Sequence, residues 1–269
     1  MVRKSSRSSS YQRLADDLAQ QITTGDLAPG SPLPSERELS DRYKVSATTV
    51  RTAIRLLKEA GLVVSHQGRG SFVRLPREKI RRDARDRYNW EKKRAALTEQ
   101  DRAQWVLQRD AAVDPSQIDF SAEFERLPAS AELAARFGIV AGTPMLHRMY
   151  RTGGPDEHGA YILSDSWLRV DLIESNPALL DPANEPWPGG TIHQLRTVGI
   201  EVARIIDEVT GRPPSPDEAR ALQLHDVGTA VLEIRKTSID TTGRVVEIAT
   251  AVLAGDRTEL VYTTDLDPW

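Results

Sequence analysis

Hydroxyl and guanidinium side chains gather near the start of one predicted helix. They are Ser46, Thr48, Thr49 and Arg51, and Arg37 stands at the head of the helix before it. Threonine hydroxyls and the fork-shaped guanidinium of arginine suit phosphate oxygens and base edges. These residues therefore predict contact with double-stranded DNA. The alternative for Arg37 and Arg51 is a pair of surface ion pairs on two ordinary helices.

A second basic stretch is the glycine-rich segment Gln67-Gly68-Arg69-Gly70, which lies between two short apolar runs. Apolar runs joined by a few residues with glycine are typical of a β-hairpin. Arg69 would stand at its tip, where it can enter a minor groove or grip the backbone. His66 either joins this contact or only stabilises the hairpin, and both interpretations stay open.

The elements that position these residues are three helices and the hairpin. Apolar residues at intervals of three to four predict the first helix, and Ser35 with Glu38 predicts a capping box at the start of the second. Ser46 is the expected N-cap of the third helix, which runs to about residue 60. Three helices followed by a two-stranded wing make a winged helix-turn-helix, whose second recognised helix lies in the major groove.

The net charge differs between the first part of the chain, which holds these elements, and the remainder. The 269 residues include 36 Lys and Arg and 39 Asp and Glu, a net charge of −3. Residues 1–82 hold 16 basic and 8 acidic residues, whereas the remainder holds 20 and 31, so the total of −3 is the sum of +8 and −11. Such asymmetry predicts a basic nucleic-acid module joined to an acidic domain with another task.

Several classes of site are excluded or disfavoured. With no cysteine, the chain has no disulfide, thiolate metal site or cysteine nucleophile. The histidines lack the spacing of metal ligands, and no nucleotide-binding fingerprint is present, so we expect no metal and no cofactor. No apolar run approaches the ~20 residues that span a bilayer, and the start is not a signal peptide. We expect a cytoplasmic protein without a membrane partner.

The expected organisation has four parts: a disordered basic tail at 1–10, the winged domain at 11–76, a linker with a helical stretch at 77–116, and a second domain at 117–269. In that last domain we expect strands near 118–124, 145–152, 159–167, 200–210, 230–239 and 245–253, with helices near 130–137, 169–175, 191–198 and 216–223. A helix, turn and strand at 131–146 are echoed at 217–232, which favours an α+β domain on a mixed sheet. The basic run between Lys79 and Arg87 is either a further phosphate grip or a solvated linker face.

The first part resembles the GntR family of bacterial transcription regulators. The stretch that carries the resemblance is PLPSERELSDRYKVSATTVRTAIRLLKEAGLVVSHQGRGSFV. The resemblance implies DNA contacts at Arg37, Thr48, Thr49, Arg51, His66, Gly68 and Arg69. Ser46 is expected to join them because it heads the recognition helix. The family often has arginine after the serine that heads the recognition helix, whereas this chain has Ala47. That difference should change the base preference at one operator position.

The remainder resembles the UTRA sensing domain of the HutC-type branch, which has a chorismate-lyase-like fold. AARFGIVAGTPMLHRMYRT, WPGGTIHQL and AVLEIRKTSIDTTGRVVEIATAVLAGDR carry this resemblance, and DPANEPWPGGTIHQL resembles actinobacterial members. The resemblance implies effector contacts at Arg148, Thr191 and Glu247, and we expect Tyr150 and Ser164 beside them. Tyr150 stands where members often have a second arginine, which disfavours a phosphorylated effector.

Three functions from different classes follow. The first is a homodimeric regulator, a repressor, that a small-molecule effector releases from its operator or retunes on it. The second is a constitutive DNA-binding dimer whose pocket is plugged by side chains such as Tyr150, Leu163 and Trp187. The third is an enzyme on the chorismate-lyase-like fold, which no identifiable nucleophile or acid–base pair supports. For Arg148 and Glu247 an ion pair inside the sheet, and for Thr191 a helix cap, are the alternatives to ligand contact.

Overall fold

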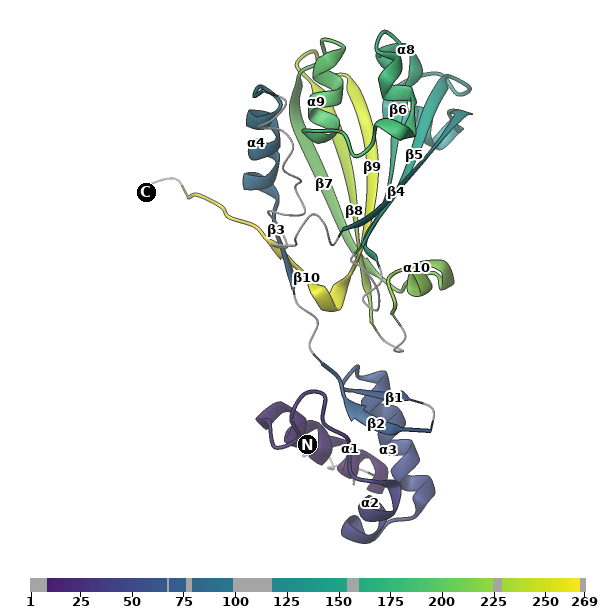
Figure 1. Cartoon of the computed structure of the whole chain (residues 1–269), viewed down its shortest axis with the longest axis vertical. Helices are drawn as coiled ribbons and strands as arrows, with labels where there is room; N and C mark the ends of the chain where they lie inside the picture. Colours follow the sequence, from purple (N-terminus) through teal and green to yellow (C-terminus); the bar gives the residue numbers. More distant parts are fainter. Residues whose placement is uncertain are drawn as a thin grey trace, which may run out of the picture. The chain divides into compact units, whose positions relative to one another are not determined.

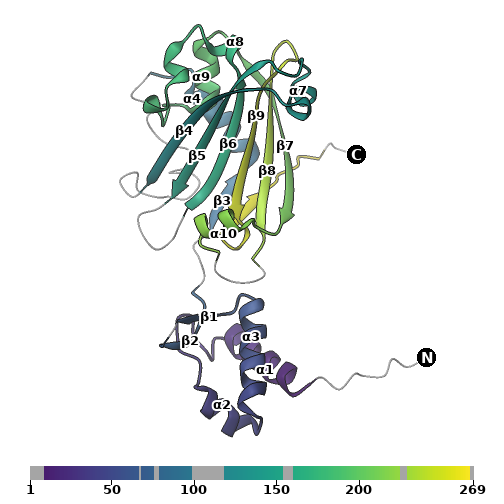
Figure 2. The same cartoon turned by 90° about the vertical axis from the view of Figure 1, so that its right-hand side faces the viewer.

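The computed structural model describes residues 9–66, 68–75, 79–98, 118–153, 160–224 and 229–266. The described chain forms two compact units (Figures 1 and 2). The first is built on Met1–Glu78, and the second on Lys79–Leu224 and Ala230–Trp269. The tail expected at 1–10 lies almost wholly outside the described residues.

The first unit contains three helices and a hairpin, α1 (Ser10–Thr24), α2 (Glu36–Tyr43), α3 (Ala47–Glu59), β1 (Val63–His66) and β2 (Gly70–Val73). The capping box predicted for α2 is confirmed: the Ser35 hydroxyl accepts from the Glu38 amide, and the Glu38 carboxylate accepts from the Ser35 amide at 2.7 Å. β1 and β2 pair antiparallel. The winged helix-turn-helix is therefore the fold of this unit.

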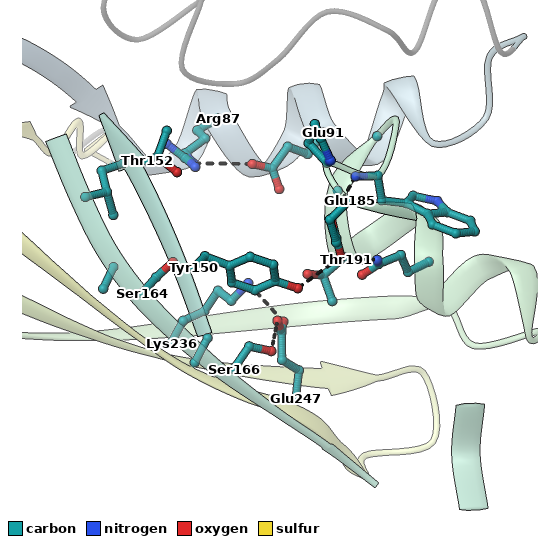
Figure 3. A pocket seen from close by; sticks show the side chains of 18 of the residues that line it. Arg87, Glu91, Tyr150, Thr152, Ser164, Ser166, Glu185, Thr191, Lys236 and Glu247 are labelled. Atoms are coloured by element: carbon teal, nitrogen blue, oxygen red, sulfur yellow. Dashed lines mark hydrogen bonds and ion pairs between the residues drawn. The ribbon is translucent and has the colours of Figure 1, made fainter. Parts of the chain in front are cut away.

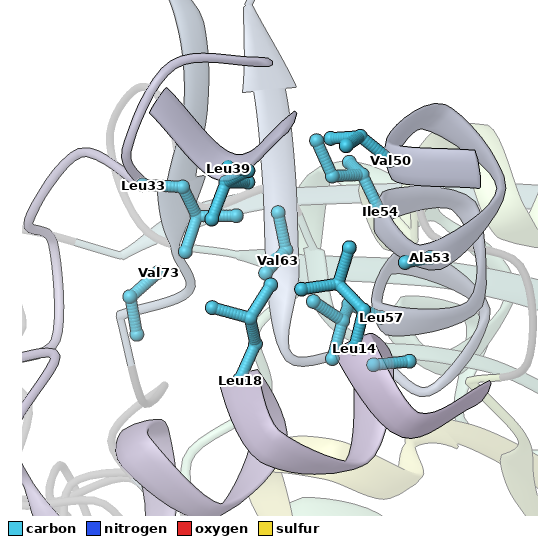
Figure 4. Packing of buried hydrophobic residues seen from close by; sticks show 11 residues of the cluster. Leu14, Leu18, Leu33, Leu39, Val50, Ala53, Ile54, Leu57, Val63 and Val73 are labelled. Carbon is cyan, nitrogen blue, oxygen red and sulfur yellow. The ribbon is translucent and has the colours of Figure 1, made fainter. Parts of the chain in front are cut away.

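One apolar core holds these elements together (Figure 4). Leu18 of α1, Leu39 of α2 and Val50 of α3 are completely buried, and Val63 and Val73 join them from the hairpin. Removing a buried leucine side chain costs about 2–5 kcal/mol. The recognition helix and the wing are thus fixed relative to each other by shared burial.

The second unit is built on a six-stranded sheet with the order β4-β5-β6-β9-β8-β7. Its strands are β4 (Asp119–Pro128), β5 (Pro144–Gly153), β6 (Ala160–Arg169), β7 (Val202–Arg212), β8 (Val231–Asp240) and β9 (Val245–Ala254). All neighbours pair antiparallel. The α+β class is confirmed, but the six strands themselves form no mixed sheet.

The sequence echo corresponds to two equivalent halves of this sheet. β4, α7 (Ala131–Phe137), β5 and β6 follow one another as do β7, α10 (Pro216–Ala221), β8 and β9. The two halves meet where β6 pairs with β9. The sequence similarity therefore marks a repeated strand–helix–strand–strand unit.

Helices cover both faces of the sheet. α7 packs on Met145, and α10 on the face that carries Leu163, whereas Leu146 faces α8 (Val170–Ile173) and α9 (Gly190–Thr197). Since successive residues of a strand point to opposite faces, Met145 and Leu146 identify two different layers. Two short 3₁₀ helices, Pro177–Leu180 and Pro182–Asn184, connect α8 to α9.

The segment expected to be a linker contains ordered structure of the second unit. β3 (Ile80–Asp83) pairs in parallel with β10 (Thr258–Val261), and α4 (Ala84–Arg94) follows directly. The parallel strand pair of the described chain is thus β3 with β10, whereas the six-stranded sheet is antiparallel. The expected helical stretch corresponds to α4, but β3 was not predicted. Trp105 and the rest of 99–117 lie outside the described residues.

Candidate DNA-binding and effector sites

The start of α3 places the predicted DNA-contacting hydroxyl groups together. Ser46 is its N-cap, and the Ser46 hydroxyl accepts from the amide of Thr49 at 3.2 Å and lies 2.9 Å from the Thr49 hydroxyl. Thr48 is exposed. Capping thus occupies part of the hydrogen-bonding capacity of Ser46 and Thr49, while Thr48 is open to a partner.

The two predicted arginines differ in their surroundings. Arg51 Nε lies 2.8 Å from Glu36 Oε2, so a carboxylate of α2 holds its guanidinium. The side chain of Arg37 is 93% exposed, and its Nε is 4.0 Å from Asp41. Exposed pairs contribute about 0–1 kcal/mol, so neither pair prevents a phosphate or base from taking the cation.

The wing brings its predicted residues to a groove of about 790 Å³ beside α2 and α3. Arg51, His66, Gly68 and Arg69 line this groove, whereas Arg37, Ser46, Thr48 and Thr49 do not. Gly68 has a φ of +74°, which a side chain would strain. The His66 ring centroid is 5.5 Å from that of Phe72, which supports the structural interpretation of His66.

Two further cations of the groove were not predicted. Arg55 and Lys58 lie one and two turns along α3 from Arg51, and both line the groove. The helical spacing of three to four residues was the signal for this shared face.

A cavity of about 290 Å³ lies in the second unit, between the sheet, α4, α9 and the segment before α9 (Figure 3). Tyr150, Ser164, Thr191 and Glu247, all predicted from the sequence, line it. Arg148 is completely buried and lies behind the lining residues. The structure therefore brings the five predicted residues together, with Arg148 in a supporting position.

Arg148 is the centre of a polar network that joins the sheet to α9. Its guanidinium donates to Gln194 Oε1 at 2.6 Å, to the Ser166 hydroxyl at 2.8 Å and to the Thr191 hydroxyl at 3.3 Å. One of its nitrogens lies 3.5 Å from Glu247 Oε1. A buried cation with these partners fixes the hydroxyl groups that face the cavity.

Glu247 is 2% exposed and is surrounded by groups that stabilise its charged form. Burial by itself would raise its pKa, but Lys236 at 2.9 Å and the Arg148 guanidinium outweigh burial and lower the pKa to about 2. The Ser166 and Ser238 hydroxyls each donate to the carboxylate at 3.0 Å. Glu247 is therefore an anion throughout the physiological range.

The loop before α9 contributes a second carboxylate that was not predicted. Glu185 Oε1 accepts from the Tyr150 hydroxyl at 3.0 Å and from Gln194 Nε2 at 2.8 Å. Burial, followed by the charge of Glu185, raises the pKa of Tyr150 despite the opposing effect of Arg148. Tyr150 thus remains a neutral phenol that is oriented by Glu185.

Two predictions about individual side chains are wrong. Leu163 packs in the cluster of α10 on the opposite face of the sheet, so it does not plug this cavity. The basic run is neither a continuous phosphate grip nor a solvated face, because Arg82 is buried and Arg87 lines the cavity. Trp187 lines the cavity, and its indole nitrogen donates to His193 at 2.9 Å.

Within the described residues, no three His, Asp or Glu side chains are grouped so as to hold a metal ion. In that same part of the chain, no helix is long and apolar enough to cross a membrane.

Comparisons with known proteins agree with both units. Residues 10–73 match the bacterial regulatory proteins of the gntR family, and residues 121–259 match the UTRA domain. The HTH-type transcriptional regulator SCO4628 of Streptomyces coelicolor is 31% identical over 92% of this chain and 89% of its own length. The HTH-type transcriptional repressor NagR of Bacillus subtilis is 27% identical over 95% of this chain and 94% of its own.

Solved structures show the same architecture. A GntR-family transcriptional regulator is 25% identical over 96% of this chain and 98% of its own, with a TM-score of 0.64. PhnF from Mycobacterium smegmatis shares the fold with a TM-score of 0.50 and 21% identity, over 94% of this chain and 100% of its own. SCO4628, NagR and the first of these solved structures are all named as transcriptional regulators or repressors. The chain belongs to the GntR family of bacterial regulatory proteins and is a DNA-binding transcription regulator with a UTRA domain.

Proposed function

We propose that this regulator is a homodimeric repressor whose affinity for a near-palindromic operator is changed by a small effector bound in the second unit. The observation that carries the effector is the buried network of Arg148 and Glu247 at a cavity that Glu247 lines. Burying two ions costs several kcal/mol each before their attraction is counted. A network that also orients hydroxyl groups toward a cavity is suited to ligand recognition.

The charges around the cavity favour an effector with little net charge. Its lining includes four cations, Arg82, Arg87, Arg94 and Lys236, and four carboxylates, Asp165, Glu91, Glu185 and Glu247. A phosphorylated ligand would need converging cations, but Tyr150 replaces the second arginine and Lys236 is paired with Glu247. The volume is near the lower end of about 300–1,000 Å³ for ligand pockets. A small polar molecule with several hydrogen-bonding groups fits best.

The DNA-binding residues proposed are those predicted from the sequence, with His66 supporting the wing, together with Arg55 and Lys58 of the groove. Two copies of α3 and its wing would read the two half-sites of the operator. If the effector prefers one state of the dimer, effector and DNA must change each other's affinity by the same factor.

The effector is tested by thermal shift with a panel of neutral and phosphorylated metabolites. We expect saturable stabilisation by a neutral or singly charged compound, because binding to the native state alone raises stability. A Thr191→Val variant should weaken this stabilisation, since it loses a hydroxyl at the cavity, while the exposed Thr241→Val serves as control. If no compound stabilises the protein but DNA binding is sequence-specific, the constitutive dimer is the better account.

A further inference from the structure

Helix α4 forms a wall of the effector cavity although it lies outside both matched domains. It presents Arg87, Tyr88, Trp90, Glu91 and Arg94 to the cavity. Figure 3 shows Arg87 and Glu91 on one side and Ser164, Ser166 and Glu247 of the sheet on the other. α4 therefore separates the polar floor of the cavity from the outside.

The side chains on the inner surface of α4 form an ordered cover. Arg87 Nε lies 3.3 Å from Glu91 Oε1, one turn further along, and these side chains are only 17% and 12% exposed. The Arg94 guanidinium stacks 4.6 Å from the Trp90 ring centroid. Both interactions lie within α4, so the helix can move without separating these pairs.

Polar contacts hold α4 on the second unit. The Tyr88 hydroxyl donates to both carboxylate oxygens of Asp207 at 2.8 and 3.0 Å. Lys92 Nζ donates to the Val202 carbonyl at 2.9 Å and lies 2.9 Å from Glu201 Oε1. Arg85 pairs with Asp265.

No residue within α4 is fully buried. Water can replace polar contacts far more cheaply than it can replace apolar packing, because exchanged hydrogen bonds largely cancel. A helix of this length is marginal in water by itself. α4 is thus held on the second unit by polar contacts and half-buried side chains, without a fully buried residue of its own.

We propose that α4 is a lid over the effector cavity, released by loss of its contacts to Asp207, Val202 and Glu201. This inference rests on the effector site proposed above. Asp83, the last residue of β3, is the N-cap of α4, and its carboxylate accepts from the Asp86 amide at 3.2 Å. β3 begins two residues after Glu78, where the DNA-binding unit ends. Release of α4 therefore acts on the segment that is covalently joined to the DNA-binding unit.

The absence of cysteine allows a direct test in the full chain without an effector or DNA. Ser164→Cys places a single thiol on the floor of the cavity, and Val140→Cys places one at a position that is 79% exposed. The probe is methyl methanethiosulfonate, a small neutral thiol reagent. We expect the thiol at position 164 to react at least about ten-fold more slowly than that at 140.

Lys92→Met and Tyr88→Phe, added to Ser164→Cys, should each speed its reaction by about two- to ten-fold, the factor expected for one hydrogen bond. Lys93→Met is the matched control, because Lys93 is the exposed neighbour of Lys92 on the same helix. Lys93→Met should not change the rate at position 164. Lys92→Met and Tyr88→Phe, here called the tether variants, should not change the rate at position 140 when they are added to Val140→Cys. Amide exchange of 84–94 should accelerate in the two tether variants only.

Equal rates for the Lys92→Met and Lys93→Met variants, or a cavity thiol as reactive as the exposed one, would contradict the proposal that α4 is a lid. Unfolding of a tether variant would show as a faster reaction together with loss of amide protection throughout the sheet, and that also overturns it. The proposed function fails independently, through the absence of effector or operator binding.

Discussion

Replacing Glu247 by glutamine removes one buried negative charge while nearly preserving shape. Lys236 and Arg148 then lose their common anion, at 2.9 and 3.5 Å. The ordinary pKa of 4.5 and the folded value of about 2 correspond to roughly 3 kcal/mol of stability at neutral pH. Breaking a buried ion pair costs about 3–5 kcal/mol, which is of the same size. For a domain of this size, the melting temperature should fall by roughly 6–12 °C.

Tryptophan fluorescence isolates the relevant transition, because all five tryptophans lie beyond residue 78. The exposed Glu123→Gln on β4 is the matched control and should change stability by less than about 0.5 kcal/mol. The folded pKa of Glu247 is lowered, so its contribution is complete above pH 4.5 and is lost as the pH falls toward 2. The difference between wild type and Glu247→Gln should shrink over that range. Equal melting temperatures at pH 7, or a difference that grows on acidification, would show that the Glu247 carboxylate does not stabilise this unit.

Three further predictions concern other parts of the chain. If Arg51 contacts a base, Arg51→Met should weaken binding to a duplex selected from a random library by about 1–3 kcal/mol. Glu36→Gln removes the ion-pair partner of Arg51 and should not weaken DNA binding. Fluorescence anisotropy measures both affinities. Leu39→Ala should destabilise the winged unit by about 2–5 kcal/mol, seen as earlier loss of helical circular dichroism with the tryptophan transition unchanged. Hydrogen bonding from Arg212 outweighs burial and lowers the pKa of Glu218 to about 2. Urea unfolding should therefore show that Glu218→Gln is less stable than the wild type at pH 7, and the difference should diminish below pH 4.5.

The local signals in the sequence predicted most of the fold. Ser35 with Glu38 and the spacing of apolar residues identify elements whose stabilising contacts are close in sequence. β3 was missed because the segment Ile-Arg-Arg-Asp is mostly charged, and its partner β10 lies more than 170 residues away. Nothing local indicates such a pairing.

The effector site was predicted in part for a similar reason. Alternation along a strand places Ser164 and Ser166 on one face and Leu163 on the other. The wrong prediction that Leu163 plugs the cavity could therefore have been avoided from the sequence. The same alternation along β8 links Lys236 and Ser238 to the cavity face. Glu185 was not predictable, since its position depends on the path of an irregular segment before α9.

The most direct test of the account measures DNA affinity with and without the compound that stabilises the protein most. Anisotropy on the selected duplex, with a scrambled duplex as control, should show sequence preference at moderate salt. Saturating compound should change the affinity by about 5- to 150-fold, corresponding to 1–3 kcal/mol of coupling, and DNA should change the affinity for the compound by the same factor. Binding without sequence preference, or saturable binding of the compound that leaves DNA affinity unchanged, would contradict it.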